Sequence, residues 1–272
     1  MSNKIGNKSG AEKALYNICV SSNKGKVREN NEDNFAINTI FRAPDKSNVN
    51  FKGSNADEPI MCTVFDGMGG EAMGEESSAI CAQTAKKLFE VMKKYSLPVD
   101  KAFDAFATDC NNKIVDMLDE KNMSRGGSTF VMAYMTQGNV YTASMGDSRI
   151  YLLKGDKLEQ LTTDHTLAMK KYNANIYTLE EALASPDNHK LTAYLGIDDE
   201  FQGLKPEKYD VLTLEKGDKL LLCSDGLYDM VSDSDIKEIL KKESDTVSYD
   251  LVKAALNAGG VDNVTCMVIE RV

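Results

Sequence analysis

Histidine, paired cysteines and long apolar runs are scarce or missing in this sequence. Only His165 and His189 are present, which excludes a metal site or a proton relay built from several histidines. No stretch reaches the ~18 apolar residues that a membrane-spanning helix needs, and residues 1–13 lack the apolar core of a signal peptide. We therefore expect no membrane insertion and a cytoplasmic location.

The cysteines exclude a disulfide framework and a zinc site. All six stand apart within apolar stretches, with no CxxC pair among them: Cys19, Cys62, Cys81, Cys110, Cys223 and Cys266. This pattern is typical of reduced thiols in the core of a cytosolic protein.

Positive charge is in deficit, with 32 Lys and Arg against 42 Asp and Glu and a formal net charge of −10. An acidic protein repels nucleic acids and anionic membranes, so neither is an expected partner. Aspartates that bind divalent cations would produce the same balance. Of the 272 residues, 42 % are hydrophobic, which is enough for a sizeable core. We expect a monomer with one domain over residues 1–272 and a loosely ordered start at 1–13.

Hydrophobic periodicity predicts both strands and helices. Strands are predicted at 16–22, 34–40, 61–65, 209–214, 219–223 and from 264, with an antiparallel meander over 127–161. Amphipathic helices are predicted at 79–94, at about 98–117, at 233–242 and at 247–257, with a short helix at 178–184. Residues 42–59 are polar and rich in turn residues, which predicts a surface loop, and the rest of 162–208 is predicted to be irregular.

Four of the predicted strands end or begin at an aspartate in a tight turn. Asp66 and Asp225 each follow an apolar run and precede a glycine, while Asp147 and Asp262 lie in the turns before other strands. Each aspartate alone has a structural explanation, because aspartate is common in turns. If these strand ends lie on one side of the fold, however, the carboxylates repel one another and require cations.

A further acidic pair, Glu32 and Asp33, follows Arg28 at the entrance of another predicted strand. Carboxylate and backbone oxygens suit Mg²⁺ or Mn²⁺ better than zinc. Two such ions bridged by one aspartate can hold a hydroxide and an anionic substrate, and Arg28 can bind a phosphate with its planar fork. These residues predict a metal-assisted phosphoryl hydrolase.

Seven short motifs in the chain resemble, in the same order, those of the metal-dependent protein serine/threonine phosphatases, the type 2C family. They are RENNED at 28–33, DGMGG at 66–70, GST at 127–129, GDSR at 146–149, LTTDHT at 161–166, SDGL at 224–227 and DNVT at 262–265. The resemblance spans residues 28–265, nearly the whole chain. The compact chain and Met68, where many eukaryotic members carry a histidine, resemble the bacterial members.

The resemblance implies an α+β fold, a four-layer α-β-β-α sandwich of two antiparallel sheets with a helix pair on each outer face. It implies that Asp66 bridges two Mn²⁺ or Mg²⁺ ions, that the Gly67 carbonyl binds one of them, and that Asp225 and Asp262 complete the direct ligands. The nucleophile would be a hydroxide bridging the metals, without a phosphoenzyme.

The remaining site residues also take roles from the resemblance. Arg28 would grip the phosphate, Glu32 and Asp33 would act mainly through bound water, and Asp147 with Asp225 would form a third metal site. Residues 166–190 resemble the flap that shapes substrate access in bacterial members.

The chain departs from the family pattern at two places. Met68 replaces a histidine proposed as general acid, so protonation of the leaving group would fall to metal-bound water. Ala193 and Tyr194 replace an Arg-Ala pair, which removes any contact from that arginine. His165 is predicted to be a structural hydrogen-bonding residue.

The implied activity is hydrolysis of phosphothreonine and phosphoserine in proteins, opposite a serine/threonine protein kinase system. One alternative is a catalytically silent family member that acts as a regulatory binding module; the intact Asp66, Asp225 and Asp262 set disfavours it. Another alternative is a phosphatase dedicated to one regulatory phosphoserine protein, and the complete motif at 28–33 disfavours that reading.

Overall fold

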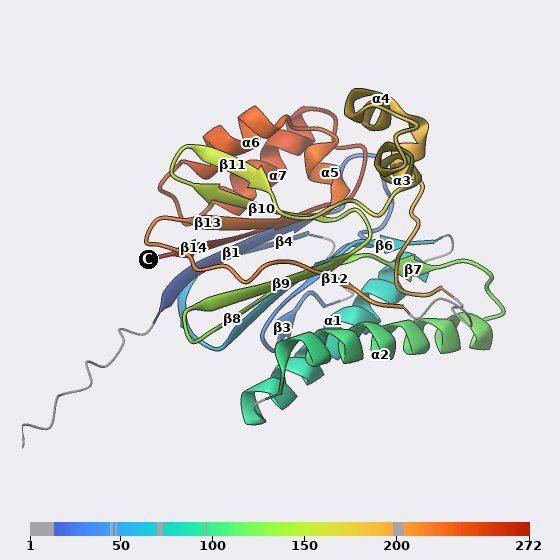
Figure 1. Ribbon diagram of the computed structural model, residues 1–272, viewed down its shortest axis with the longest axis horizontal. Helices are drawn as coiled ribbons and strands as arrows, with labels where there is room; N and C mark the ends of the chain where they lie inside the picture. Colours follow the sequence, from blue (N-terminus) through green and yellow to red (C-terminus); the bar gives the residue numbers. More distant parts are fainter. Residues whose placement is uncertain (1–13, 44–45, 47, 70–72, 96, 198–203) are drawn as a thin grey trace, which may run out of the picture.

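Two six-stranded antiparallel sheets face each other and carry helices on their outer sides in the computed structural model (Figure 1). The structure describes residues 14–43, 46, 48–69, 73–95, 97–197 and 204–272, with only the backbone for 52–55. The start predicted to be loosely ordered, 1–13, lies outside the described residues. The predicted four-layer α-β-β-α sandwich is confirmed.

The first sheet has the strand order β11-β10-β13-β14-β1-β4. Its strands are β1 (Leu15–Asn23), β4 (Asn48–Asp57), β10 (Arg149–Lys154), β11 (Lys157–Gln160), β13 (Lys219–Cys223) and β14 (Val264–Arg271). The second sheet has the order β12-β9-β8-β5-β2-β3. Its strands are β2 (Asn34–Ile37), β3 (Ile40–Phe41), β5 (Ile60–Phe65), β8 (Phe130–Thr136), β9 (Asn139–Met145) and β12 (Glu207–Lys208).

A short two-stranded ladder lies next to the second sheet, on the side where β5 ends and β8 begins. It pairs β6 (Gly67–Met68) with β7 (Gly127–Ser128), so that Gly67 lies opposite Ser128 and Met68 opposite Gly127. The ladder places the residues after β5 beside those before β8.

Two long helices, α1 (Met73–Lys94) and α2 (Val99–Glu120), cover the second sheet. The helices α5 (Asp225–Tyr228), α6 (Asp233–Leu240) and α7 (Val247–Asn257) cover the first. Apart from both layers, α3 (Leu167–Asn173), α4 (Leu179–Ala184) and the 3₁₀ turn η1 (Pro186–His189) form a small cap near α5. The cap corresponds to the predicted segment 166–190.

Three apolar cores hold these layers together, one at each interface. The first core lies between α1, α2 and the second sheet, the second between the sheets, and the third between the first sheet and α5–α7. Side chains alternate across a strand and repeat at helical spacing along a helix, so each sheet can bury both faces and each helix one.

The predicted surface loop at 42–59 is wrong, because its second half is the strand β4. Val49 and Phe51 alternate with Asn48 and Asn50, and the two apolar side chains pack on the core between the sheets. β4 is an edge strand that pairs with β1 alone. An edge strand exposes polar residues on its open side, which explains its loop-like composition.

Three other strand predictions need correction. The predicted meander over 127–161 is split between the sheets, because β8 pairs with β9 in the second sheet and β10 pairs with β11 in the first. The predicted strand 34–40 is a hairpin of β2 and β3, which turns at Asn38 with a φ of 56°. The predicted strand 209–214 is mostly irregular, with one bridge between Leu212 and Val140. The short helices α3 and α5 were not predicted.

Among the described residues, no helix is both long and apolar enough to cross a membrane.

Candidate metal centre

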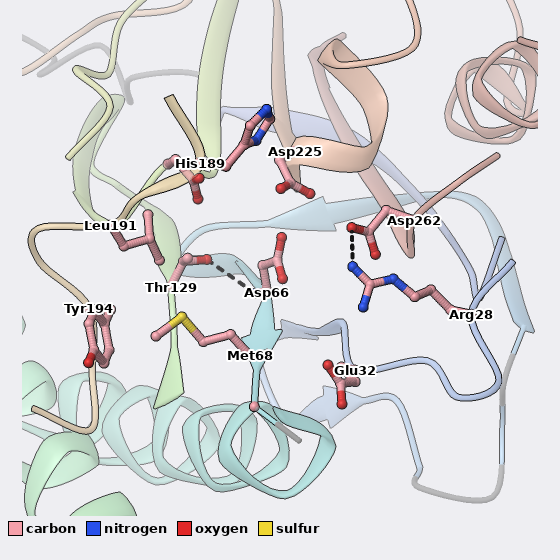
Figure 2. Close-up of a pocket in the computed structure, with 13 residues that line it drawn as sticks. Arg28, Glu32, Asp66, Met68, Thr129, His189, Leu191, Tyr194, Asp225 and Asp262 are labelled. Carbon is pink, nitrogen blue, oxygen red and sulfur yellow. Dashed lines mark hydrogen bonds and ion pairs between the residues drawn. The ribbon is translucent and has the colours of Figure 1, made fainter. Parts of the chain in front are cut away.

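The strand ends that carry the predicted aspartates meet around one cavity of about 610 Å³ (Figure 2). Asp66 follows β5, Asp147 lies between β9 and β10, Asp225 begins α5, and Asp262 precedes β14. The cavity is lined by Arg28, Glu32, Asp66, Gly67, Met68, Gly69, Thr129, Asp147, His189, Leu191, Tyr194, Asp225 and Asp262. All the predicted site residues except the fully buried Asp33 are in this lining.

The turn after β5 is fixed by backbone contacts on both sides. The Asp66 N–H donates to Thr129 Oγ1 across 3.2 Å, and the Thr129 N–H donates to the Asp66 carbonyl across 2.8 Å. Gly67 is packed so tightly that a Cβ there would lie 2.1 Å from the Gly74 carbonyl oxygen and 2.5 Å from that of Glu32. Only glycine fits this position, and the Asp66 carboxylate is therefore mounted on a rigid turn.

The side chain of Asn263, next to Asp262, links the loop of residues 24–32 to the start of β14. Its Oδ1 accepts from the Glu32 N–H across 2.7 Å, and its Nδ2 donates to the carbonyls of Asn30 and Lys24 across 2.8 and 2.9 Å. These bonds hold the loop with Glu32 against the start of β14.

Asp33 lies fully buried behind the cavity. Its Oδ2 accepts from Ser224 Oγ across 2.7 Å, which ties it to the residue before Asp225. No donor among the described residues reaches its Oδ1, although that atom is buried. A buried carboxylate oxygen without a partner is costly.

Burial and the charges of neighbouring carboxylates raise the pKa values of Asp33, Asp66, Asp147 and Asp225. Burial raises the pKa of Asp33 to about 7, and the charges of Asp225 and Asp262 add to the effect. Burial and the charge of Asp262 raise the pKa of Asp225 to about 6. For Asp66 and Asp147 the pKa also rises well above its usual range, first through burial and then through the charge of Asp225.

This donor set fits hard divalent cations. The lining offers several carboxylates and one imidazole, that of His189, and Mg²⁺ and Mn²⁺ prefer oxygen ligands such as these carboxylates. The orphaned Oδ1 of Asp33 and the raised pKa values both indicate negative charge that lacks compensation. Cations at this position would supply it.

Arg28 approaches this cluster from its open side. Its Nη2 donates to Asp262 Oδ2 across 2.7 Å, while 53 % of its side chain stays exposed. An arginine at the rim can pair with an incoming anion.

His189 and Asp229 also belong to the site, although the sequence did not indicate them as ligands. Their ligand atoms and those of Asp225 all lie within 4.8 Å of one another, and His189 Nδ1 is 3.8 Å from Asp229 Oδ2. Asp229 follows Asp225 at helical spacing, a signal that the sequence offered. Nothing in the sequence around His189 places it here.

The turn with Asp147 is supported by side chains that do not reach the cavity. His165 Nδ1 accepts from the Gly146 N–H across 3.0 Å, as its predicted structural role requires, and its Nε2 lies 2.8 Å from Glu207 Oε2. Tyr228 donates its hydroxyl to the Asp147 carbonyl across 2.9 Å. The backbone of the turn that carries Asp147 is thereby fixed from two directions.

A family model described as protein phosphatase 2C matches residues 49–258 of the chain. Serine/threonine phosphatase stp of Listeria innocua is 30 % identical over 92 % of this chain and 94 % of its own length. Protein phosphatase PhpP of Streptococcus pneumoniae is 30 % identical over 93 % of this chain and 96 % of its own.

Two solved structures share the fold closely. The Mycobacterium tuberculosis serine/threonine phosphatase PstP/Ppp covers 94 % of this chain and 99 % of its own with a TM-score of 0.77 and 28 % identity. The catalytic domain of PstP in complex with two manganese ions has a TM-score of 0.76 and 28 % identity over 95 % of this chain and 99 % of its own.

The chain therefore belongs to the protein phosphatase 2C family of metal-dependent protein serine/threonine phosphatases. The family predicted from the seven motifs is confirmed, and with it the prediction of a phosphoprotein phosphatase. The relatives described above are bacterial proteins, as the prediction of a bacterial-type member requires.

Proposed function

We propose that this chain hydrolyses phosphothreonine and phosphoserine in proteins through two divalent cations, Mn²⁺ or Mg²⁺, held by Asp66, the Gly67 carbonyl, Asp225 and Asp262. The observation that supports this most strongly is the convergence of partly and fully buried carboxylates from separate parts of the chain on one cavity. Four carboxylates with few positive charges nearby repel one another. The arrangement is therefore favourable only if cations bind there.

The other acidic residues have supporting roles in this proposal. Glu32 and Asp33 act mainly through bound water, in keeping with the burial of Asp33 behind Ser224. Asp147 with Asp225 forms a third metal site, and the group formed by His189, Asp225 and Asp229 lies next to it. The assignment of three ions is part of the proposal.

When bound, such cations supply a nucleophile at neutral pH by lowering the pKa of water, and they neutralise the charge of the phosphoryl group. The chain itself positions the substrate. Arg28 leaves Asp262 and binds the phosphoryl oxygens. Its planar guanidinium can form two parallel hydrogen bonds with them. Asp66 stays in place because its turn is bonded to Thr129 on both sides. Met68 carries no proton to donate to the leaving group.

We infer the substrates and the opposing kinase system from the proposed chemistry and from the relatives. Phosphorylated proteins are the substrates, and a serine/threonine protein kinase system places the phosphates that this enzyme removes. We propose a cytoplasmic monomer. The names of the relatives, serine/threonine phosphatase and protein phosphatase, support the substrate class.

Hydrolysis of a phosphothreonine peptide with Mn²⁺, with EDTA, and by Asp66→Asn tests the proposal. We expect EDTA to abolish activity and Asp66→Asn to lower kcat by about a thousandfold or more, since metal catalysis contributes several kcal/mol. Asp116→Asn, on the exposed side of α2, is the matched control and should keep full activity. Full activity in EDTA, or an unaffected Asp66→Asn enzyme, refutes the metal mechanism.

A further inference from the structure

We propose that the cavity has a second, apolar half that binds an apolar side chain next to the phosphorylated residue of the substrate. This inference rests on the proposed phosphatase function. Met68, Leu191 and Tyr194, together called the apolar shelf, line the same cavity as Asp66. Figure 2 shows Leu191 and Tyr194 on one side of Asp66 and Arg28 on the other, with Met68 extending toward Tyr194.

Backbone pairing sets the position of the shelf. Met68 lies opposite Gly127 in the ladder of β6 and β7, and Ser128 forms two backbone hydrogen bonds of 2.9 Å with Leu195. Successive residues of an extended segment point to alternate faces. Met68, Gly127 and Tyr194 therefore point to the same face.

Gly127 provides the room in which the ring of Tyr194 lies. A Cβ at position 127 would lie 2.7 Å from Tyr194 Cδ2 and 2.5 Å from the Leu195 carbonyl oxygen. The ring packs directly on the backbone here, and this contact restricts its movement on that face. A binding surface that is already fixed loses little conformational entropy when a ligand arrives.

Leu191 is held in a similar way at the base of the segment 166–190. Backbone hydrogen bonds of 2.8 Å flank it, from the Leu167 N–H to the Lys190 carbonyl and from the Thr192 N–H to the His165 carbonyl. Like the other shelf residues it is only partly buried, so its apolar surface remains available to a ligand.

Charge divides the cavity into two unlike halves. Apart from the shelf, its lining holds the carboxylates, His189 and Arg28, and Arg28 faces the phosphate in the proposed function. Within the described lining there is no lysine and no second arginine to receive an acidic neighbour of the phosphorylated residue. An apolar neighbour would instead bury surface on the shelf, which is favourable, whereas an acidic one meets the carboxylates.

A set of phosphothreonine peptides tests the shelf, each with leucine, phenylalanine or glutamate on one side of the phosphothreonine. With Mn²⁺ we expect kcat/KM for the better apolar peptide to exceed that of its glutamate counterpart about tenfold, the effect of one well-buried side chain. Tyr194→Ala should reduce this ratio to about twofold, mainly by raising KM for the apolar peptide. The ratio is the readout, so a general loss of activity does not count.

Tyr172→Ala is the matched control, because Tyr172 lies on α3 in the neighbouring segment 166–190, is 37 % exposed and does not line the cavity. It should keep the wild-type ratio. Leu191→Ala is a second shelf variant that keeps the test decisive if Tyr194→Ala does not fold. Equal kcat/KM for all peptides in the wild type, or an unchanged ratio in the shelf variants, refutes the shelf alone. If the wild type hydrolyses neither these peptides nor p-nitrophenyl phosphate, the proposed function fails and the shelf with it.

Discussion

The buried guanidinium of Arg42 donates from Nε to the backbone carbonyl of Asp33 across 2.8 Å. Its other nitrogens donate to the carbonyls of Asn31 and Lys46, each across 2.8 Å, and Nη2 lies 3.7 Å from Glu75 Oε1. The loop that carries Glu32 and Asp33 is thus held from behind by a cation that does not line the cavity. We therefore expect Arg42 to act as a positioning residue for this side of the candidate metal centre.

Replacing Arg42 should therefore damage both stability and metal binding. Arg42→Met leaves three carbonyls without their donor, and we expect the free energy of unfolding to fall by about 3 kcal/mol or more. Manganese affinity should fall as well, because the loop loses its support. Urea unfolding and a Mn²⁺ titration measure the two effects.

The exposed Arg125→Met is the control for this substitution and should stay within about 0.5 kcal/mol of the wild type. An Arg42→Met protein that unfolds and binds Mn²⁺ like the Arg125 variant would contradict the positioning role.

The stability of the protein without metal should fall as the pH rises. The pKa values of Asp33, about 7, and Asp225, about 6, lie above the roughly 3.9 of an unfolded aspartate. Between about pH 4 and pH 7 the folded state therefore binds more protons than the unfolded chain, and its stability decreases through that window. Thermal unfolding in EDTA should give a higher midpoint at about pH 5 than at about pH 8.

Manganese should reverse this order, because cations bind the deprotonated carboxylates and stabilise the folded state. Asp33→Asn removes one titrating group, so its midpoint in EDTA should depend less on pH, while exposed Asp116→Asn should follow the wild type. A midpoint in EDTA that rises with pH would show that the carboxyl groups are not held as described.

The pair formed by Arg149 and Asp164 should be strongly coupled. Arg149 donates from Nε and Nη2 to the buried carboxylate of Asp164, the latter bond at 2.7 Å, and its guanidinium lies 3.5 Å from the centroid of the Tyr228 ring. Arg149→Met leaves the buried Asp164 without its cationic partner, which should cost about 3–5 kcal/mol. The double variant Arg149→Met/Asp164→Leu should recover much of that loss in urea unfolding. Additive effects of the two single substitutions would exclude the coupling.

The proposed third cation site requires Asp147 more than Asp229. We expect Asp147→Asn to weaken the weakest of three Mn²⁺ sites at least about tenfold and to leave the two stronger sites intact. Isothermal titration with Mn²⁺ measures this. Asp229→Asn is the comparison: if it removes the weak site while Asp147→Asn does not, then the third ion lies with His189 and Asp225.

Much of the cavity lining could be predicted because its residues lie in local patterns. Asp66 and Asp225 each follow an apolar run and precede a glycine, and such a turn needs no distant information. The alternation and helical spacing that predicted β1, α1, α2 and α7 are likewise local properties of the chain. The motifs then connected these separate turns to one family.

The parts that could not be predicted depend on tertiary contacts. Val49 and Phe51 lie in a stretch that is mostly polar because β4 is an edge strand, and its pairing with β1 is not a local property. Arg42 is buried where its guanidinium meets the loop before β2 and Glu75 of α1, contacts that are distant from it in the sequence or not visible in it. His189 reaches the site because the segment 166–190 closes back on Thr166 through a bridge to Leu191.

The hydrogen bonds of Asn263 also have a consequence for folding during protein synthesis. They join the start of β14 to the loop around Glu32, and β14 lies between β13 and β1 in the first sheet. On the ribosome, Asp262 and this central strand emerge after all the other proposed ligands. The sheet and the metal centre can therefore assemble only once β14 has been made, so a nascent chain halted before Asp262 should take up no Mn²⁺ and remove no phosphate.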